Sequence, residues 1–598
     1  MTWTHKDTHR RILSICLLGV LSASAYGQSY DKRAPYTQIV WSEEEERPRV
    51  RLRDTWYTLE AINGLATEAL IDFARRTYAD RWQKRFDEDL VEVLTRMGHP
   101  PEETVRLTLF DAEARRSLTL EAVPMTGANR QAIIASKYPQ RRDQAQARPD
   151  VTRRVLTQEE VEADLDAFER LLQERFAYLK MHHVDYHAAL ASIRQRARQG
   201  MPALVFAREL QKVFGLFIDG HAGLDVEVPG GYLPFLIRPA GNRFVAFMPD
   251  RTGFLDEAHP YITQLDGKPL AEWINTLAPY IAKGSPQYVT HQVLRRLRTL
   301  QFVRPLMGIT NTDQVQVALA SADGQDVVTK VIDLSDKSPI YGTWPIRESQ
   351  VLEDNIGYLR LASMDEEAVE AVNAWMPRFR DTEGLIIDVR GNGGGSRDAL
   401  LEVFPYFMTP DDAPYIANVA AYRLYNGFGE DHLEARFMYR ADAPRWREAE
   451  RSAIEAFMQA FDPEWIPPAD DFSAWHYLVL SKKQDDPRYH YDNPVVVLLD
   501  DRCFSATDIF LGAFKGWRKV TLMGTPSGGG SARSVGFALP HSGLQGRMAS
   551  MASFQRNGKL YDGNGIQPDV ELEPSPAYYI QGGHDHSLEY AIAFLKDP

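Results

Sequence analysis

The C-terminal 240 residues alternate almost wholly apolar segments with helical ones, and this constrains the fold most strongly. The apolar runs are GLIIDVR (384–390), PVVVLL (494–499) and KVTLMG (519–524). Strands that are apolar at nearly every position are typical of a sheet covered by helices on both faces. In such sheets, functional side chains gather in the loops that follow the carboxyl ends of the strands. A site is therefore expected in the loops that follow these runs.

The net charge of −14 argues against a nucleic-acid surface and against a polybasic membrane patch. At the N-terminus, a basic stretch, the apolar run ILSICLLGVLSA and small residues predict a signal peptide at 1–27. The protein is then exported, periplasmic or extracellular, with no transmembrane segment in the mature chain. Ile15 before Cys16 argues against a lipid anchor. Cys503 would be the one cysteine left, which excludes a disulfide and a cysteine-rich metal site.

Four regions follow the predicted signal peptide. They are an N-terminal α+β region at 30–148, a helical region at 155–229, a mixed region at 230–340 and an α/β core at 345–598. The helical region opens with a capping box, Thr157 to Glu160. The first and third regions share an order of strand, Asn-Gly or Asp-Gly turn, helix and two further strands. This order predicts a diverged internal repeat, and both regions resemble PDZ modules.

Ser505 follows the second apolar run, in DDRCFSATDIF (500–510). The SATD pattern predicts a helix N-cap, with Asp508 at the third helical position. The same place suits a nucleophile, because free N–H groups at a helix start stabilise developing negative charge. Ser505 is therefore predicted to cap the helix and to carry chemistry. Cys503 is an alternative nucleophile, although small buried filler fits it better.

Two further features bear on chemistry. The glycines of RGNGGGS (390–396) make either a flexible turn or a close backbone approach to a ligand, and no GK[ST] follows that would make a phosphate loop. His221, in FIDGHAGL, is either a structural residue or the base that a serine nucleophile needs. His183 and His187 have helical i, i+4 spacing, but without an acidic or cysteine partner they predict a solvated helix start. No metal or cofactor is expected.

Five motifs in order carry a resemblance to a known family: NIGYLRLASM, GLIIDVRGNGGG, PVVVLLDDRCFSATDIFLGAF, VTLMGTPSGGG and GNGIQPDVELEP. From about residue 155 to 598 the chain resembles the S41 serine peptidases, the tail-specific or C-terminal processing proteases. The resemblance implies an α/β core of the crotonase-like (ClpP/crotonase) type, with a helical subdomain and a PDZ-like module. It also implies an oxyanion hole formed by the N–H groups of Gly395 and Ala506.

The S41 family has two catalytic styles. One uses a Ser–Lys dyad, but Gly530 stands at the place of the lysine here. The other, that of the tricorn protease core, uses a histidine before the PDZ-like module and a carboxylate before G-[IV]-x-P-D. His221 and Asp562 lie at those two places. Tricorn has a bridging serine before the histidine, where this chain has Gly220, so the link must be direct, water-mediated or made by Asp219.

The expectation is an exported serine endopeptidase that acts on peptides or unfolded proteins. Ser505 is its nucleophile, His221 its general base and Asp562 the residue that orients the imidazole. A non-catalytic peptide- or ligand-binding protein on the same fold is the main rival, and a hydrolase of non-peptide acyl bonds is a third alternative. An ordinary histidine base predicts activity that rises through about pH 6.5.

Overall fold

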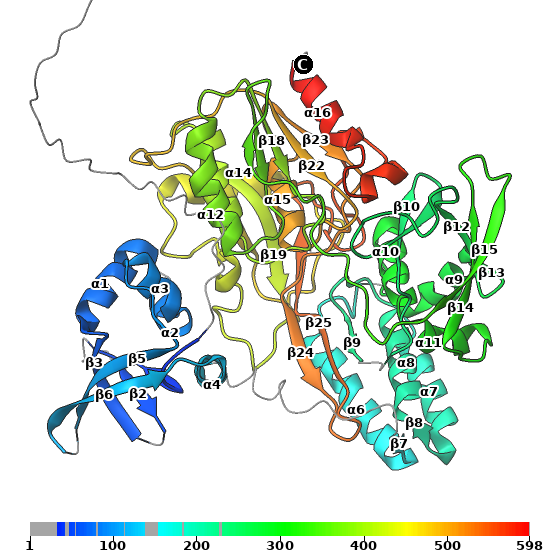
Figure 1. Ribbon diagram of the computed structural model, residues 1–598, viewed down its shortest axis with the longest axis horizontal. Helices are drawn as coiled ribbons and strands as arrows, with labels where there is room; N and C mark the ends of the chain where they lie inside the picture. Colours follow the sequence, from blue (N-terminus) through cyan, green and yellow to red (C-terminus); the bar gives the residue numbers. More distant parts are fainter. Residues whose placement is uncertain are drawn as a thin grey trace, which may run out of the picture. The chain divides into compact units, whose positions relative to one another are not determined.

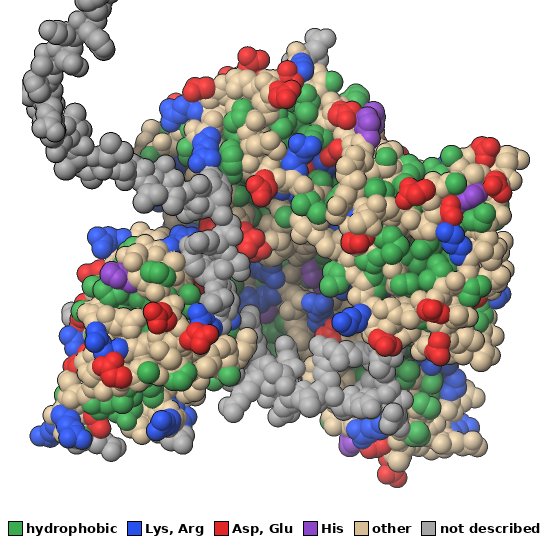
Figure 2. Space-filling model, in the orientation of Figure 1, with side chains coloured by type: hydrophobic (Ala, Val, Ile, Leu, Met, Phe, Trp, Pro, Cys, Tyr) green, Lys and Arg blue, Asp and Glu red, His purple; other side chains and the backbone are tan. Residues whose placement is uncertain are grey.

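The computed structural model describes residues 33–41, 47–53, 55–78, 82–112, 114–137, 154–181, 184–226 and 230–596. The chain divides into two compact units, residues 1–148 and 149–598. The predicted signal peptide lies outside the described residues. Within the described ranges, no helix combines the length and the apolar character needed to cross a membrane. On the face shown in Figure 2, acidic and basic side chains are interspersed.

The first unit is one antiparallel sheet with helices packed on it (Figure 1). The strand order is β1-β2-β3-β5-β6, and β4 pairs with β3. The strands are β1 (Gln38–Val40), β2 (Arg49–Leu52), β3 (Thr55–Ile62), β4 (Leu65–Ala66), β5 (Thr104–Asp111) and β6 (Arg116–Pro124). The helices are α1 (Thr67–Tyr78), α2 (Trp82–Glu88), α3 (Leu90–Arg96) and α4 (Gly127–Lys137). Asn63 and Gly64 both have positive φ, which fits the tight turn between β3 and β4.

The second unit contains a sheet of the same strand order, β10-β11-β12-β14-β15, with β13 paired to β12. Its strands are β10 (Leu236–Ala240), β11 (Arg243–Phe247), β12 (Tyr261–Leu265), β13 (Lys268–Pro269), β14 (Gln314–Ala320) and β15 (Val327–Asp333). Its helices are α9 (Leu270–Leu277), α10 (Pro286–Leu297) and α11 (Leu300–Val303). Asp266 and Gly267 repeat the positive-φ turn. Both sheets therefore follow one connection pattern, as a diverged repeat would.

The helical region consists of α6 (Gln158–Arg175), α7 (Tyr186–Arg196) and α8 (Ala203–Phe214), with the short pair β7 (Val155–Leu156) and β8 (Met201–Pro202). The predicted capping box is confirmed: the Thr157 side chain accepts from Glu160 N–H, and Glu160 accepts from Thr157 N–H. After α8 the chain forms β9 (Gly223–Asp225), which pairs with β25 (Gln545–Ala549) beside β24 (Ser534–Ala538). This pairing ties the segment that carries His221 to the C-terminal core.

The core sheet has the order β16-β17-β18-β22-β23-β27 and is parallel from β17 to β27. Its strands are β16 (Gln350–Val351), β17 (Ile356–Arg360), β18 (Gly384–Asp388), β22 (Val495–Leu499), β23 (Val520–Gly524) and β27 (Val570–Glu571). Leu385 and Ile387 pack with α12 (Glu366–Trp375), α13 (Asp398–Val403) and α15 (Ala506–Phe514). Ile386 packs on the other face with α16 (His586–Lys596). The predicted sheet with two covered faces is confirmed.

A second, smaller sheet in the core has the order β20-β21-β19-β26. It consists of β19 (Tyr415–Tyr422), β20 (Tyr439–Arg440), β21 (His476–Leu480) and β26 (Met551–Phe554), with α14 (Glu448–Ala460) packed on it. Most of this sheet comes from the chain between α13 and β22, so it is an insertion between two neighbouring strands of the parallel sheet.

Candidate active site

Ser505 lies between β22 and α15 with an unusual backbone, φ 61° and ψ −117°. Its side chain makes no capping hydrogen bond, so the prediction that Ser505 caps this helix is wrong. The reason is the backbone, since capping residues usually have extended dihedrals. The hydroxyl instead faces His221, and Ser505 Oγ lies 3.2 Å from His221 Nε2. That distance is within the reach of a nucleophile and its base.

His221 is held in place through its backbone. It lies between α8 and β9, and its N–H donates to Asp219 Oδ1 at 2.8 Å. Asp219 is completely buried, and its other oxygen accepts from Ala549 N–H of β25 at 2.7 Å. Asp219 therefore joins the histidine loop to the core. The sequence indicates Asp219 only as an alternative acid that could orient the imidazole.

Asp562 is also buried, and both of its oxygens accept hydrogen bonds from groups other than the imidazole. Oδ1 accepts from Gly220 N–H at 2.9 Å, and Oδ2 accepts from the Tyr178 hydroxyl at 2.9 Å and from Ser531 N–H at 3.1 Å. Oxygens of Asp219 and Asp562 and a ring nitrogen of His221 lie within 4.8 Å of one another. No hydrogen bond joins them, because His221 Nδ1 has no hydrogen-bond partner among the described residues. Of the predicted links, the direct one is absent, and the spacing fits one bridging water.

Burial controls the electrostatics of this cluster. It raises the pKa of Asp219 and that of Asp562, and repulsion from Asp562 raises the pKa of Asp219 further. Burial also lowers the pKa of His221 to about 3, with smaller contributions from the charges of Arg436 and Arg547. The imidazole is therefore neutral at physiological pH, the form in which it accepts a proton. This shift places the expected acid limb of activity below pH 6.5.

Among the described residues, Asp219, His221 and Asp562 form the group whose ligand atoms come close enough to hold a metal ion. All four carboxylate oxygens of Asp219 and Asp562 already accept hydrogen bonds. Three of these oxygens each accept from a backbone N–H group. The fourth, Asp562 Oδ2, accepts from both Ser531 N–H and the Tyr178 hydroxyl. These donors would point toward a cation, so the site suits hydrogen bonding better than metal ligation. His187 pairs with Glu169 at 2.9 Å, and His183 lies outside the described residues.

The glycine loop after β18 meets the serine loop because β18 and β22 are parallel neighbours. Asn392 connects them: its Oδ1 accepts from Gly394 N–H at 2.9 Å and from the Thr507 hydroxyl at 2.7 Å. In the described part of the chain, neither Gly395 N–H nor Ala506 N–H donates to a protein acceptor. Both amides are thus available to an oxyanion.

Three contributing residues escaped prediction from the sequence. Tyr178 comes from the distant helical region, and no local pattern marks it. Asn392 stands inside the glycine motif, where its amide was a visible but unused signal. Phe504 directly precedes Ser505, and its ring contacts His221. Cys503 is buried with a strongly raised pKa and its thiol donates to Val389 O at 3.1 Å, so the filler role is confirmed.

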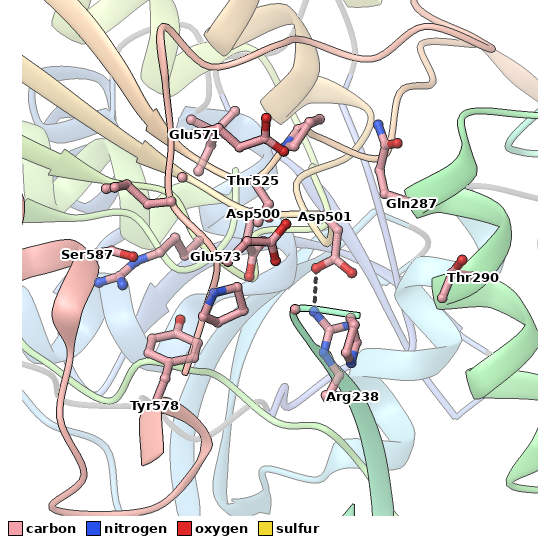
Figure 3. Close-up of a pocket in the computed structure, with 18 of the residues that line it drawn as sticks. Arg238, Gln287, Thr290, Asp500, Asp501, Thr525, Glu571, Glu573, Tyr578 and Ser587 are labelled. Atoms are coloured by element: carbon pink, nitrogen blue, oxygen red, sulfur yellow. Dashed lines mark hydrogen bonds and ion pairs between the residues drawn. The ribbon is translucent and has the colours of Figure 1, made fainter. Parts of the chain in front are cut away.

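A cavity of about 440 Å³ adjoins the start of the serine loop at Asp500 and Asp501 (Figure 3). It opens between β10 and α10 on one side and the carboxyl ends of β22, β23 and β27 on the other. Its labelled polar residues are Arg238, Gln287, Thr290, Asp500, Asp501, Thr525, Glu571, Glu573, Tyr578 and Ser587. Arg238 and Asp501 form a buried ion pair across it. Neither Ser505 nor His221 lines this cavity, so it is separate from the serine–histidine pair.

Comparisons with known proteins agree with the motifs. Residues 355–572 match the model of peptidase family S41. The carboxy-terminal processing protease CtpB of Bacillus subtilis (strain 168) is 34% identical over 71 residues, 12% of this chain and 15% of that protein. The crystal structure of mature CPAF covers 73% of this chain and 97% of its own, at 16% identity and a TM-score of 0.53, which shows a shared fold. The chain therefore carries a domain of peptidase family S41 at residues 355–572.

Proposed function

We propose that this protein is a serine endopeptidase with Ser505 as its nucleophile. The family of its core domain supports peptide-bond hydrolysis. The observation that carries the assignment of the site is the 3.2 Å approach of Ser505 Oγ to His221 Nε2. These two residues are 284 positions apart in the chain. Chance is a poor explanation for their meeting at the strand end where a site is expected.

In the proposed reaction, Ser505 Oγ attacks the carbonyl carbon of a peptide bond and its proton passes to His221 Nε2. The negative oxygen of the tetrahedral intermediate accepts from the N–H groups of Gly395 and Ala506. The imidazolium then gives its proton to the leaving nitrogen, the C–N bond breaks, and an acyl-enzyme remains. Water, deprotonated by His221, hydrolyses the ester and frees Ser505.

Asp562 and Asp219 stabilise the imidazolium in this scheme, although neither bonds to it directly. A water between Nδ1 and a carboxyl oxygen would accept from Nδ1–H and fix the tautomer that presents Nε2 to the serine. Burial raises the pKa values of both carboxyls, so their negative charge costs more here than in water and supports the imidazolium less. This arrangement predicts a slower enzyme than one with a directly bonded Asp–His pair.

The substrate class is a peptide or an unfolded protein, which the PDZ-like region at 230–340 would help to hold. Addition of a peptide strand to the free edge of β10 has little support. The carbonyls of Ile237 and Pro239 on that edge accept from the hydroxyls of Tyr341 and Tyr579, at 2.9 and 2.8 Å, and proline has no N–H. The cavity beside β10 is a better place for a peptide end. The sequence at 1–27 supports export to the periplasm or the extracellular space.

A non-catalytic binding protein on this fold is the second candidate. The observation in its favour is the buried Nδ1 of His221 without a partner among the described residues. A histidine without an orienting hydrogen bond could accompany a site that binds peptides without cleaving them.

A fluorophosphonate probe separates the two candidates, because it phosphonylates an activated serine with loss of fluoride. We expect one adduct, located by mass spectrometry on Ser505, that disappears in Ser505→Ala and falls steeply in His221→Ala. Ser527→Ala serves as a control serine close in sequence. An adduct on another residue, or no adduct on protein shown to be folded by its thermal transition, would contradict the peptidase assignment and favour the binding protein.

A further inference from the structure

One aromatic ring packs against the histidine that faces Ser505. The Phe504 ring lies 4.7 Å from the His221 ring, centroid to centroid, with 34° between their planes. The same ring stacks on Tyr288 of α10 at 5.7 Å and 18°. Phe504 is the residue next to the proposed nucleophile, so a change in the position of its ring would shift both Ser505 and the His221 imidazole.

Two glycines make room for this ring, and both are departures from the patterns of the S41 family. A Cβ at Gly220 would lie 2.6 Å from Phe504 Cζ and 2.8 Å from Cε2, and a Cβ at Gly530 would overlap the same two ring atoms. Real Cβ atoms essentially never approach so closely. In the family's two styles these positions carry a bridging serine and a catalytic lysine. Here a single ring fills the space that either side chain would need.

The backbone on both sides of the ring is fixed. Gly220 N–H donates to Asp562, and Gly220 C=O accepts from the Tyr288 hydroxyl at 3.0 Å. Gly530 N–H donates to Asp508 Oδ2 at 3.0 Å. Neither segment can therefore move away without breaking a hydrogen bond with a buried partner. A larger residue at position 220 or 530 must displace the ring instead.

We propose that Phe504 is a positioning residue, which holds the His221 imidazole toward Ser505 by a tilted ring-to-ring contact in place of the missing polar partners at 220 and 530. This inference rests on the proposed function. A ring packed at 4.7 Å against the imidazole restricts its rotation about the Cβ–Cγ bond, while hydrogen bonding to Nε2 and Nδ1 stays possible at the ring edge. The ring also excludes water from the imidazole, in agreement with the direction in which the pKa of His221 is shifted.

The test measures the rate of Ser505 phosphonylation as a function of pH in a set of variants. In Phe504→Ala we expect a rate roughly 10- to 100-fold below wild type, the loss typical of a misplaced catalytic group. The acid limb of its pH profile should move up toward about 6.5, because the imidazole becomes hydrated. Phe504→Leu keeps apolar volume without a flat face, so it should also be slow while remaining folded. Cys503→Ala, a buried neighbour on the same loop, is the matched control and should label at the wild-type rate.

A double-mutant cycle tests the shared space directly. Gly220→Ser alone should be slow, because the new side chain collides with the ring. Gly220→Ser combined with Phe504→Ala should label roughly 5- to 10-fold faster than Gly220→Ser, since residues that compete for one space give non-additive effects. Additive losses, together with an unmoved acid limb in Phe504→Ala and Phe504→Leu, would overturn the proposal. An unlabelled wild-type protein would instead contradict the peptidase function itself.

Discussion

Ser505 holds a backbone conformation that costs a non-glycine residue about 1–3 kcal/mol, with φ 61° and ψ −117°. Such dihedrals persist only where the surroundings fix them. Here the Phe504 N–H donates to Asn392 O at 3.2 Å, and the Thr507 hydroxyl donates to Asn392 Oδ1 on the other side of the serine. The conformation aims the hydroxyl at His221 instead of at the helix amides. At this residue, strain and hydrogen bonding together favour reactivity over capping.

In the proposed mechanism, the pH dependence of the reaction depends on His221. Its pKa is lowered to about 3, first by burial and then by Arg436 and Arg547. A base works when it is unprotonated, so a lowered pKa moves the acid limb of activity to lower pH. We expect the phosphonylation rate of wild type to be flat between about pH 5 and 8 and to fall only below about pH 4. The measurement is the labelling rate across that range, on protein checked for folding at each pH.

Arg547→Gln provides a second test of this prediction, since it removes one of the positive charges that lower the pKa of His221. Its acid limb should lie at higher pH than that of wild type. A wild-type limb centred near pH 6.5 would show that water reaches the imidazole and would contradict the buried environment.

At the scale of elements, the site depends on two parallel neighbours, β18 and β22, whose following loops meet at one edge of the sheet. The contact between the loops is tight at Gly394. This residue has φ +102°, and a Cβ there would lie 2.6 Å from Phe504 O and 2.7 Å from Ser505 Cβ. A side chain at this position would push directly on the nucleophile.

Gly394→Ala should therefore lower the free energy of unfolding by about 1–3 kcal/mol and slow the labelling of Ser505. Gly393→Ala is the matched control. It lies one residue earlier, φ is not positive, and nothing lies within 4 Å of its Cβ position. We expect it to keep both stability and labelling. The measurements are denaturant unfolding and the labelling rate, and equal effects of the two substitutions would show that the loops are not packed as described.

Some elements could be predicted from the sequence, and the reason is local. The strands of the core sheet are apolar along their length, and Thr157 and Glu160 cap α6 as their spacing requires. The absence of a cap at Ser505 could not be predicted, because SATD has the spacing of a cap while the contacts of Asn392 impose another backbone. Where a distant residue fixes the local conformation, a local pattern is an incomplete guide.

At the scale of the whole molecule, the two compact units divide the proposed chemistry unequally. Ser505, His221 and Asp562 all lie in the unit of residues 149–598, which has its own apolar cores. A chain limited to residues 149–598 should fold and label at Ser505 within about 3-fold of the full chain, because a unit with its own core can fold alone. Thermal unfolding and the labelling rate check this. Loss of labelling in a folded truncated chain would show that the first unit contributes to the site.

The sequence by itself determined the α/β core and the S41 motifs, and it singled out Ser505, His221 and Asp562 as the proposed site residues, because each is written in a short stretch of chain. The tertiary structure decided how they are held. Asp562 bonds to Gly220, Tyr178 and Ser531 instead of to the imidazole, and burial moves the pKa of His221 far from its ordinary value. The glycines at 220 and 530 look like losses in the sequence, yet in space they admit the ring of Phe504. Contacts among segments hundreds of residues apart determine orientation and protonation, and no single stretch of sequence encodes them.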